Sequence, residues 1–322
     1  MNSADGQQLF IVGVGRSGTS LLQCMLDAHN LISFTPEIHF IRRFLATRVL
    51  DRMWQQDRRA VLRLLAEDSL VKRLRFDTDD LQQIVESVDQ EFSSRNLYLE
   101  LQRRYARAQH KDNVRWFGDK DPRSIEYLPL LAARFPGMRV LHIIRDPRDV
   151  LASKKKAQWS EQRSVLRHAF ANRVQMKLGR HQGRRLLGSR YMAFHYEELI
   201  GDAPGVLSRI CEFLGIPFDP SMLQFSERAK LLVTEGEMQW KKEALGPLLG
   251  KNSGKWKQEL TRWDVALVER ICGRMMAEEG YEVSTTAKGL ALSQQIALGA
   301  SSLLLACADP LYRFWRTVRS GK

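Results

Sequence analysis

The sequence predicts an α/β protein of three layers, with helices on both faces of a central, mostly parallel sheet. Two observations support this fold class. Short buried strands alternate with helices along the chain, and the first strand leads through a glycine-rich loop directly into a helix. Strands joined by helices pair in parallel and are buried on both faces.

Three short apolar runs have the length and the residue types of buried strands. The first is closed by glycine, and the second ends at Arg145. After it, Asp146 is a good N-cap and Pro147 a good first helical residue, so a helix is expected to begin there. The predicted strands are Leu9–Val14, Met138–Ile144 and Tyr191–Phe194.

Helices are predicted from Thr19 onward and again after Pro204. Residues 42–115 are charged, poor in glycine and favourable to helix, and we expect them to flank or cap the sheet. A chain of 322 residues can bury a full core, and residues 1–285 are predicted to form one large domain. Residues 286–322 are predicted to form a C-terminal amphipathic and basic tail.

The chain has 50 basic and 37 acidic residues and a formal net charge of +13. Such an excess favours anionic partners, such as a nucleotide, a membrane surface or nucleic acid. A nucleic-acid-binding protein would gather basic with aromatic residues or show a recognisable reading motif. The basic residues are instead spread over predicted helices that are also rich in acidic residues, so no nucleic-acid partner is expected. A basic nucleic-acid-binding protein is kept as an alternative function.

The segment Gly13–Ser20 (GVGRSGTS) is predicted to surround a phosphate between the first strand and the first helix. Its glycines fit the nucleotide-binding pattern GxxxxGK[ST], and backbone N–H groups at a helix N-terminus can surround a phosphate. Such a loop makes the predicted fold P-loop-like. Hydroxyl donors are added by Ser17, Thr19 and Ser20.

The loop departs from the nucleoside-triphosphate pattern at one position. Thr19 stands where the pattern has lysine, and Arg16, two residues before Gly18, supplies a cation instead. No strand ends in a lone Asp that would hold Mg²⁺. Phosphate binding is therefore expected, and hydrolysis of a nucleoside triphosphate is not. The alternative enzyme is a P-loop kinase-like phosphotransferase that acts on a small molecule.

A second phosphate site is predicted at the same edge of the sheet. Arg145 ends the second predicted strand, and Ser153 lies two turns into the following helix (RDPRDVLASKKK). Ligands of open α/β sheets bind beyond the C-terminal ends of the strands, so Arg145 is expected to lie beside the first loop. Two such sites fit a nucleotide with separate phosphates. The alternative is that Arg145 pairs with Asp149 or another carboxylate.

These segments together resemble the PAPS-dependent sulfotransferase family, whose donor is 3′-phosphoadenosine 5′-phosphosulfate. GRSGTSLL and RDPRDVLAS resemble its two main motifs, and FHYEELI, FLGIPF, GKWKQELT and EEGYE follow in consistent order, so that the resemblance runs from Leu9 to Tyr281. The sequence is most similar to the tyrosylprotein and carbohydrate branches. The resemblance implies an enzyme that moves a sulfuryl group from PAPS to a hydroxyl or amine acceptor without a metal.

The resemblance also assigns donor-binding residues. It implies that Arg16–Ser20, with Gly18 among them, bind the 5′-phosphate, and that Arg145 and Ser153 bind the 3′-phosphate. Leu21 replaces the tryptophan that stacks on adenine in small-molecule enzymes, and Tyr196 resembles the family tyrosine near the adenine. The basic loop near residues 251–257 resembles, in position only, the loop that closes over PAPS.

Four residues are candidates for the transfer step. Arg16 could reach the bridging oxygen of the donor, and Lys120 (FGDKDP) resembles the lysine of the tyrosylprotein branch that helps to stabilise the departing phosphate there. Lys120 could instead form a surface ion pair with Asp119 or Asp121. Glu37 (FTPEIHF) resembles the base of the tyrosylprotein branch, and a carboxylate needs a raised pKa to take a hydroxyl proton well. His39 titrates nearer neutrality and is the second candidate for the base.

The acceptor and the surroundings of the protein are less defined. Residues 40–115 are expected to form an acceptor-side helical insertion, and carbohydrate, protein tyrosine, lipid and small-molecule acceptors stay open. No signal peptide is seen before the first strand, so a cytoplasmic protein is expected. The tail could dock on the domain or on a partner, or it could contact an anionic membrane surface as a peripheral anchor. The sequence assigns no oligomeric state.

Overall fold

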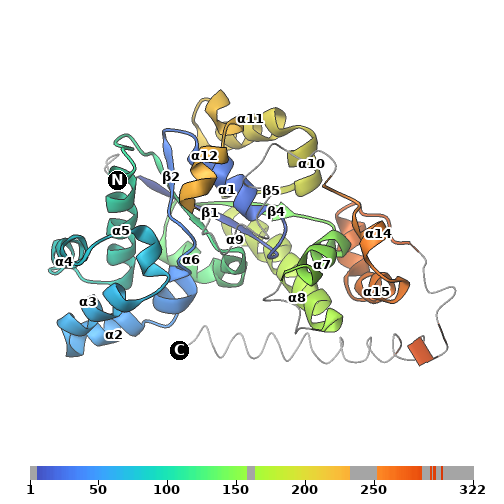
Figure 1. The fold of residues 1–322 in the computed structure, drawn as a ribbon, viewed down its shortest axis with the longest axis horizontal. Coiled ribbons are helices and arrows are strands. Elements are labelled where there is room, and N and C mark those ends of the chain that lie inside the picture. Colours follow the sequence, from blue (N-terminus) through green and yellow to red (C-terminus); the bar gives the residue numbers. More distant parts are fainter. Residues whose placement is uncertain are drawn as a thin grey trace.

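A five-stranded parallel sheet forms the centre of the structure. The computed structural model describes residues 6–157, 164–232 and 252–284, together with residues 291, 293, 294 and 299. Strand β1 lies in the middle, between β3 and β4, and the strand order is β2-β3-β1-β4-β5 (Figure 1). The strands are β1 (Gln7–Gly13), β2 (Ile32–Phe34), β3 (Trp116–Lys120), β4 (Arg139–Ile144) and β5 (Tyr191–His195).

Helices cover both faces of this sheet, which confirms the predicted three-layer α/β class. Successive side chains of a strand point to opposite faces, and β1 shows this clearly. Leu9 and Ile11 pack with one set of helices: α1 (Thr19–Asp27), α10 (Tyr196–Gly201), α11 (Ala203–Leu214) and α12 (Ser226–Leu232). Phe10 and Val12 face the other set: α2 (Val49–Gln56), α3 (Arg58–Glu67), α4 (Thr78–Ser87), α5 (Ser94–Ala108), α6 (Leu128–Arg134) and α9 (Arg184–Leu187).

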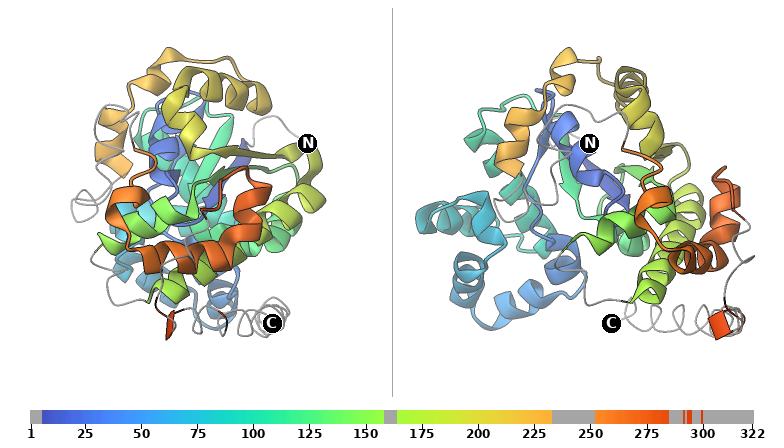
Figure 2. Two further views of the ribbon diagram at one scale, coloured as in Figure 1. Left: turned by 90° about the vertical axis from the view of Figure 1, so that its right-hand side faces the viewer. Right: turned by 45° about the vertical axis from the view of Figure 1, so that its right-hand side comes forward.

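A third group of helices packs beyond the C-terminal ends of β1 and β4. Helices α7 (Pro147–Lys155), α8 (Val165–Leu178) and α15 (Arg262–Glu278) lie against one another through small and apolar side chains (Figure 2). Ile144, the last residue of β4, packs with Val150 of α7 and Met275 of α15. The short helix α14 (Trp256–Glu259) contacts α7 and precedes α15.

The three predicted strands are present with their ends shifted by one or two residues. Helix α7 begins as predicted, because Asp146 accepts a hydrogen bond from the N–H of Arg148 and Pro147 follows it. The helix predicted after Pro204 begins one residue earlier, at Ala203, because Asp202 is its N-cap. Most of residues 42–115 lie in α2 to α5 and in two short helices, η1 (Ile41–Leu45) and η2 (Val71–Leu74).

Strands β2 and β3 are additions to the sequence-based prediction. Strand β2 has only three residues, and β3 (WFGDK) ends in charged side chains, so neither has a long apolar run. Among the described helices, none combines the length and the apolar composition needed to cross a membrane. The predicted tail, residues 286–322, lies outside the described residues except at the four single positions given above.

Candidate active site

The loop between β1 and α1 presents a helix N-terminus at the C-terminal edge of the sheet. Gly18 is the N-cap of α1, and its φ of +92° lies in the left-handed region that favours glycine. Because Gly18 has no side chain to cap the helix, the N–H groups of the first turn are left for a ligand or water. Arg16 also has a positive φ, 81°, and such backbone strain is typical of functional sites. This geometry suits an anion.

Arg145 lies beside this loop because β1 and β4 are parallel neighbours in the sheet. Its Nη1 donates to the backbone oxygen of Arg16 at 3.0 Å, and Arg16 Nε donates to Ser153 Oγ at 3.0 Å. The structure therefore brings the first loop, the end of β4 and helix α7 together. In the part of the chain that the structure describes, Arg145 donates to backbone oxygens and forms no ion pair with Asp149.

Tyr196 and Asn252 complete the surroundings of Arg145. The guanidinium of Arg145 lies 4.2 Å from the centre of the Tyr196 ring, and its Nη2 donates to the backbone oxygen of Asn252 at 2.8 Å. The amide of Asn252 donates to the Tyr196 hydroxyl at 2.7 Å. Sequence reasoning missed Asn252; its only signal was the general position of the basic loop near residues 251–257.

Two buried donors in this group lack a partner among the described residues. They are Ser17 Oγ and Arg145 Nε. Burying an unpaired donor costs about 1–3 kcal/mol, so such atoms point to a ligand or an ordered water. A hydroxyl, a guanidinium and a helix N-terminus all donate and suit a ligand that carries phosphate groups.

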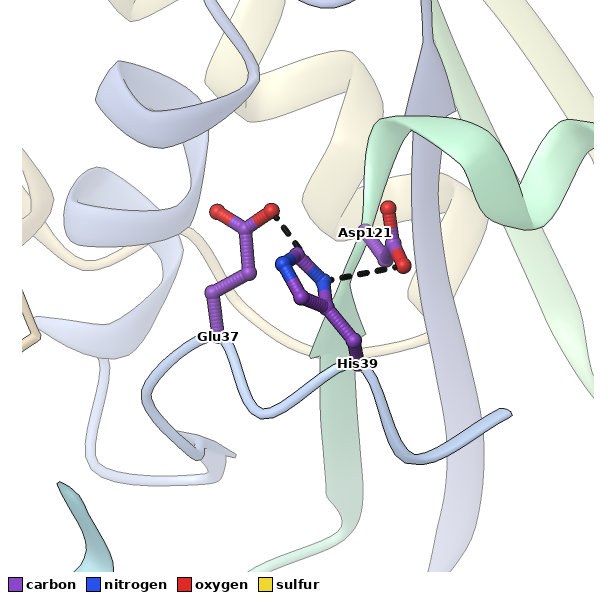
Figure 3. A group of neighbouring side chains, drawn as sticks. All are labelled: Glu37, His39 and Asp121. Carbon is purple, nitrogen blue, oxygen red and sulfur yellow. Dashed lines mark hydrogen bonds and ion pairs between the residues drawn. The ribbon is translucent and has the colours of Figure 1, made fainter. Parts of the chain in front are cut away.

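The other candidate residues gather on the opposite side of the loop, where β2 and β3 end. Glu37 and His39 follow β2, Lys120 is the last residue of β3, and Asp121 follows it. Lys120 Nζ donates to Glu37 Oε2. His39 Nδ1 lies 3.0 Å from Asp121 Oδ2 and 3.4 Å from Glu37 Oε1, between the two carboxylates (Figure 3). Lys120 is buried with 1% of its side chain exposed, so its pair with Glu37 is not a surface ion pair.

Charges within this cluster set the protonation of its aspartates. Burial alone would raise the pKa of Asp121, but the hydrogen bond from His39 and the charges of His39 and Arg42 lower it to about 2. Asp121 is therefore ionised at neutral pH, and its Oδ2 holds the His39 ring at Nδ1. Burial and the nearby charge of Asp121 raise the pKa of Asp119 to about 7.

Glu37, His39 and Asp121 could also be considered as metal ligands. One ligand atom from each lies within 4.8 Å of the others. However, Lys120 already donates to Glu37, and Arg42 Nε donates to Asp121 at 2.9 Å. A metal ion would have to displace or sit beside two side-chain cations, so the cluster is better described as an ion-pair network.

The strand order places these two groups on either side of one loop. Strand β1 lies between β3 and β4 and leads into the loop of Gly18. Lys120 at the end of β3 is therefore on one side of the loop, and Arg145 after β4 is on the other. An extended ligand with its centre on the loop would meet the donors around Arg145 at one end and the Glu37 network at the other.

Comparison with known proteins agrees with this arrangement. Residues 8–220, about two thirds of the chain, match the family model described as Sulfotransferase family. The chain belongs to the sulfotransferase family. The predicted class of enzyme is thereby confirmed, and neither the kinase nor the nucleic-acid-binding alternative is favoured.

Several relatives of this sulfotransferase have assigned names. It is 25% identical over 283 residues to protein-tyrosine sulfotransferase 1 of Danio rerio, covering 85% of this chain and 72% of the relative. It is 27% identical over 236 residues to protein-tyrosine sulfotransferase 2 of Gallus gallus, covering 68% of this chain but only 54% of the relative. Carbohydrate sulfotransferase 1 of Rattus norvegicus is 25% identical over 177 residues, 48% of this chain and 41% of the relative.

A solved structure shares the fold. The sulfotransferase domain from the Synechococcus PCC 7002 olefin synthase superposes with a TM-score of 0.59 at 21% identity. The match covers 87% of this chain and 97% of that domain. The match supports the P-loop-like fold class. At 21% identity it says nothing about the donor or the acceptor.

Proposed function

We propose that this sulfotransferase uses PAPS as its sulfuryl donor. The observation that carries the proposal is the loop of Gly18, which has unpaired buried donors on it and beside it, at Ser17 and Arg145. Residues Arg16–Ser20 would bind the 5′-phosphate, and Arg145 with Ser153 would bind the 3′-phosphate. Tyr196 is fully buried and stacks on Arg145, so it would support Arg145 at the nucleotide.

We propose Glu37 as the base of an in-line transfer. The acceptor oxygen forms a bond to sulfur, the bond from sulfur to the bridging oxygen of the donor breaks, and the acceptor proton passes to Glu37. Lys120 and Arg16 stabilise the negative charge that develops on the departing phosphate. Since Lys120 is bonded to Glu37, an anionic donor would compete for its ammonium group and leave the carboxylate freer to take a proton.

His39 is the second candidate for the base, because Asp121 holds its ring at Nδ1 and the acceptor proton would pass to Nε2. His39 Nδ1 lies 3.4 Å from Glu37 Oε1, so an acceptor hydroxyl beside Glu37 would also lie near the His39 ring. The helical insertion reaches the same place: Arg73 Nη1 donates to the backbone oxygen of Glu37 at 3.2 Å. We therefore propose that α2 to α5 border the acceptor, whose hydroxyl could belong to a protein, a carbohydrate or a smaller molecule.

The donor proposal is tested by binding of adenosine 3′,5′-bisphosphate (PAP), the product that PAPS leaves behind. We expect saturable binding that ATP with Mg²⁺ does not compete. Arg145→Ala should weaken binding roughly 10- to 100-fold, because it removes charge-assisted hydrogen bonds. Arg139→Ala is the matched control, since Arg139 lies at the other end of β4. Equal competition by ATP would contradict the proposal and favour a kinase.

The proposal for the base needs a sulfation assay with labelled donor across acceptor classes. Glu37→Gln should not weaken PAP binding, because it removes a competitor for Lys120, and it should lower kcat by roughly 10²- to 10⁴-fold. His39→Asn should have the smaller effect on kcat. If Glu37→Gln keeps full turnover and His39→Asn does not, His39 is the base.

A further inference from the structure

The first turn of α7 holds a segment that is distant in sequence, residues 252–256. One oxygen of the Asp149 carboxylate accepts the backbone N–H of Gly254 at 2.6 Å, and the other accepts that of Trp256 at 2.9 Å. Asp149 is buried, with 2% of its surface exposed. Because both oxygens of a buried carboxylate accept hydrogen bonds from one short segment, they hold that segment firmly in place.

Arg148 contacts the same segment through the aromatic ring of Trp256. Its guanidinium lies 3.9 Å from the centre of the Trp256 ring, at stacking distance. The guanidinium is itself held by Asp146, and its Nη1 donates to Glu269 of α15 at 2.7 Å. Because Arg148 is tied on two sides, the indole rests on a rigid surface.

The anchored segment leads directly to the donor site. Asn252, two residues before Gly254, donates to the Tyr196 hydroxyl and accepts from Arg145 through its backbone oxygen. Gly254, whose N–H Asp149 accepts, has φ +72° and makes a left-handed turn between Asn252 and Trp256. The position of Asn252 therefore depends on contacts at Gly254 and Trp256.

We propose that Asp149 is a positioning residue of the donor site: it fastens residues 252–256 so that Asn252 holds Arg145 and Tyr196 in their binding geometry. The proposal rests on the proposed use of PAPS. It gives Asp149 a role in donor affinity although its own carboxylate faces backbone N–H groups.

A purely structural role is the competing explanation. Asp149 lies in the first turn of α7, where a carboxylate interacts favourably with the helix dipole. A residue that acts only on the helix would change the unfolding temperature but not the affinity for a nucleotide. The two explanations therefore differ in the measurement of binding.

The test compares the full-length protein with Asp149→Asn. The amide can accept only one of the two N–H groups, and its own NH₂ meets the other. We expect the Kd for PAP, measured by calorimetry, to rise about tenfold, the effect of losing one charge-assisted hydrogen bond. The backbone N–H groups of Gly254 and Trp256 should exchange with solvent faster in the variant, with or without PAP. Asp149→Glu, which keeps the carboxylate, should recover part of the affinity.

Asp202→Ala is the matched control, because Asp202 also accepts a backbone N–H, that of Gly205 at 2.9 Å, but caps α11. It should lower the unfolding temperature and leave PAP affinity unchanged. Unchanged affinity and unchanged exchange in Asp149→Asn would overturn the inference. If the wild-type protein does not bind PAP, the donor proposal fails, and hydrogen exchange alone decides whether Asp149 fastens the segment. If Asp149→Asn does not fold, Asp149→Glu is used in both measurements.

Discussion

Replacing Gly18 with alanine should disturb the donor site and the fold at once. A Cβ at this position would lie 2.3 Å from Cδ2 and 2.6 Å from Cε2 of the Tyr196 ring. Tyr196 is fully buried and bonded by Asn252, so the ring has no free space in which to move away. The φ of +92° adds backbone strain, because side chains rarely adopt the left-handed region.

The size of the effect follows from these two terms. A left-handed backbone costs a residue with a Cβ about 1–2 kcal/mol, and overpacking a filled core costs about 1–3 kcal/mol. Gly18→Ala should therefore lower the free energy of unfolding by about 2–5 kcal/mol. Gly137→Ala isolates the first term, because Gly137 has φ +87° and nothing lies within 4 Å of its Cβ position.

Urea unfolding of both variants measures the difference, and PAP binding measures its consequence for the site. The Gly18 variant should be less stable than the Gly137 variant by about 1–3 kcal/mol. It should also bind PAP more weakly, because the displaced ring no longer supports Arg145 at 4.2 Å. Equal stability of the two variants would refute the close packing of Gly18 on Tyr196.

Three further predictions concern stability. The carboxylates of Glu279 and then Glu198 raise the pKa of His195 to about 9 against the effect of burial. The protonated His195 therefore contributes fully to the free energy of unfolding below about pH 6.5, and this contribution is lost as the pH rises through 9. Urea unfolding of His195→Gln should no longer show this pH dependence. The pKa of Asp121 is about 2, so its carboxylate contributes roughly 2 kcal/mol to the free energy of unfolding above about pH 4, and this contribution is lost toward pH 2. The free energy of unfolding of Asp121→Asn should fall less between about pH 4 and pH 2. Lys111→Met should lower the free energy of unfolding by about 3 kcal/mol, because one carboxylate and three backbone oxygens would lose their hydrogen-bond donor. A thermal unfolding temperature equal to that of the wild type would contradict this.

The sheet centre and the first loop could be predicted from sequence because their signals are local. The run Leu9–Val12 of β1 is apolar throughout, β4 is apolar apart from Arg139 and His142, and Asp146 and Pro147 mark the start of α7 by their own chemistry. The partnership of Arg145 with Asn252 could not be predicted in the same way. It joins residues 107 positions apart through a backbone oxygen, which leaves no mark on residue type.

Strand β3 was missed for a physical reason that concerns the site itself. Its last residues, Asp119 and Lys120, are charged yet buried, and they break the apolar pattern by which a central strand is recognised. Lys120 is tolerated there because Glu37 neutralises it, and Asp119 because burial raises its pKa to about 7 and Tyr98 donates to it at 2.9 Å. Departures from local rules are expected where function requires them. The two residues that concealed the strand lie at its C-terminal end, where Lys120 pairs with Glu37, the residue that we propose as the base.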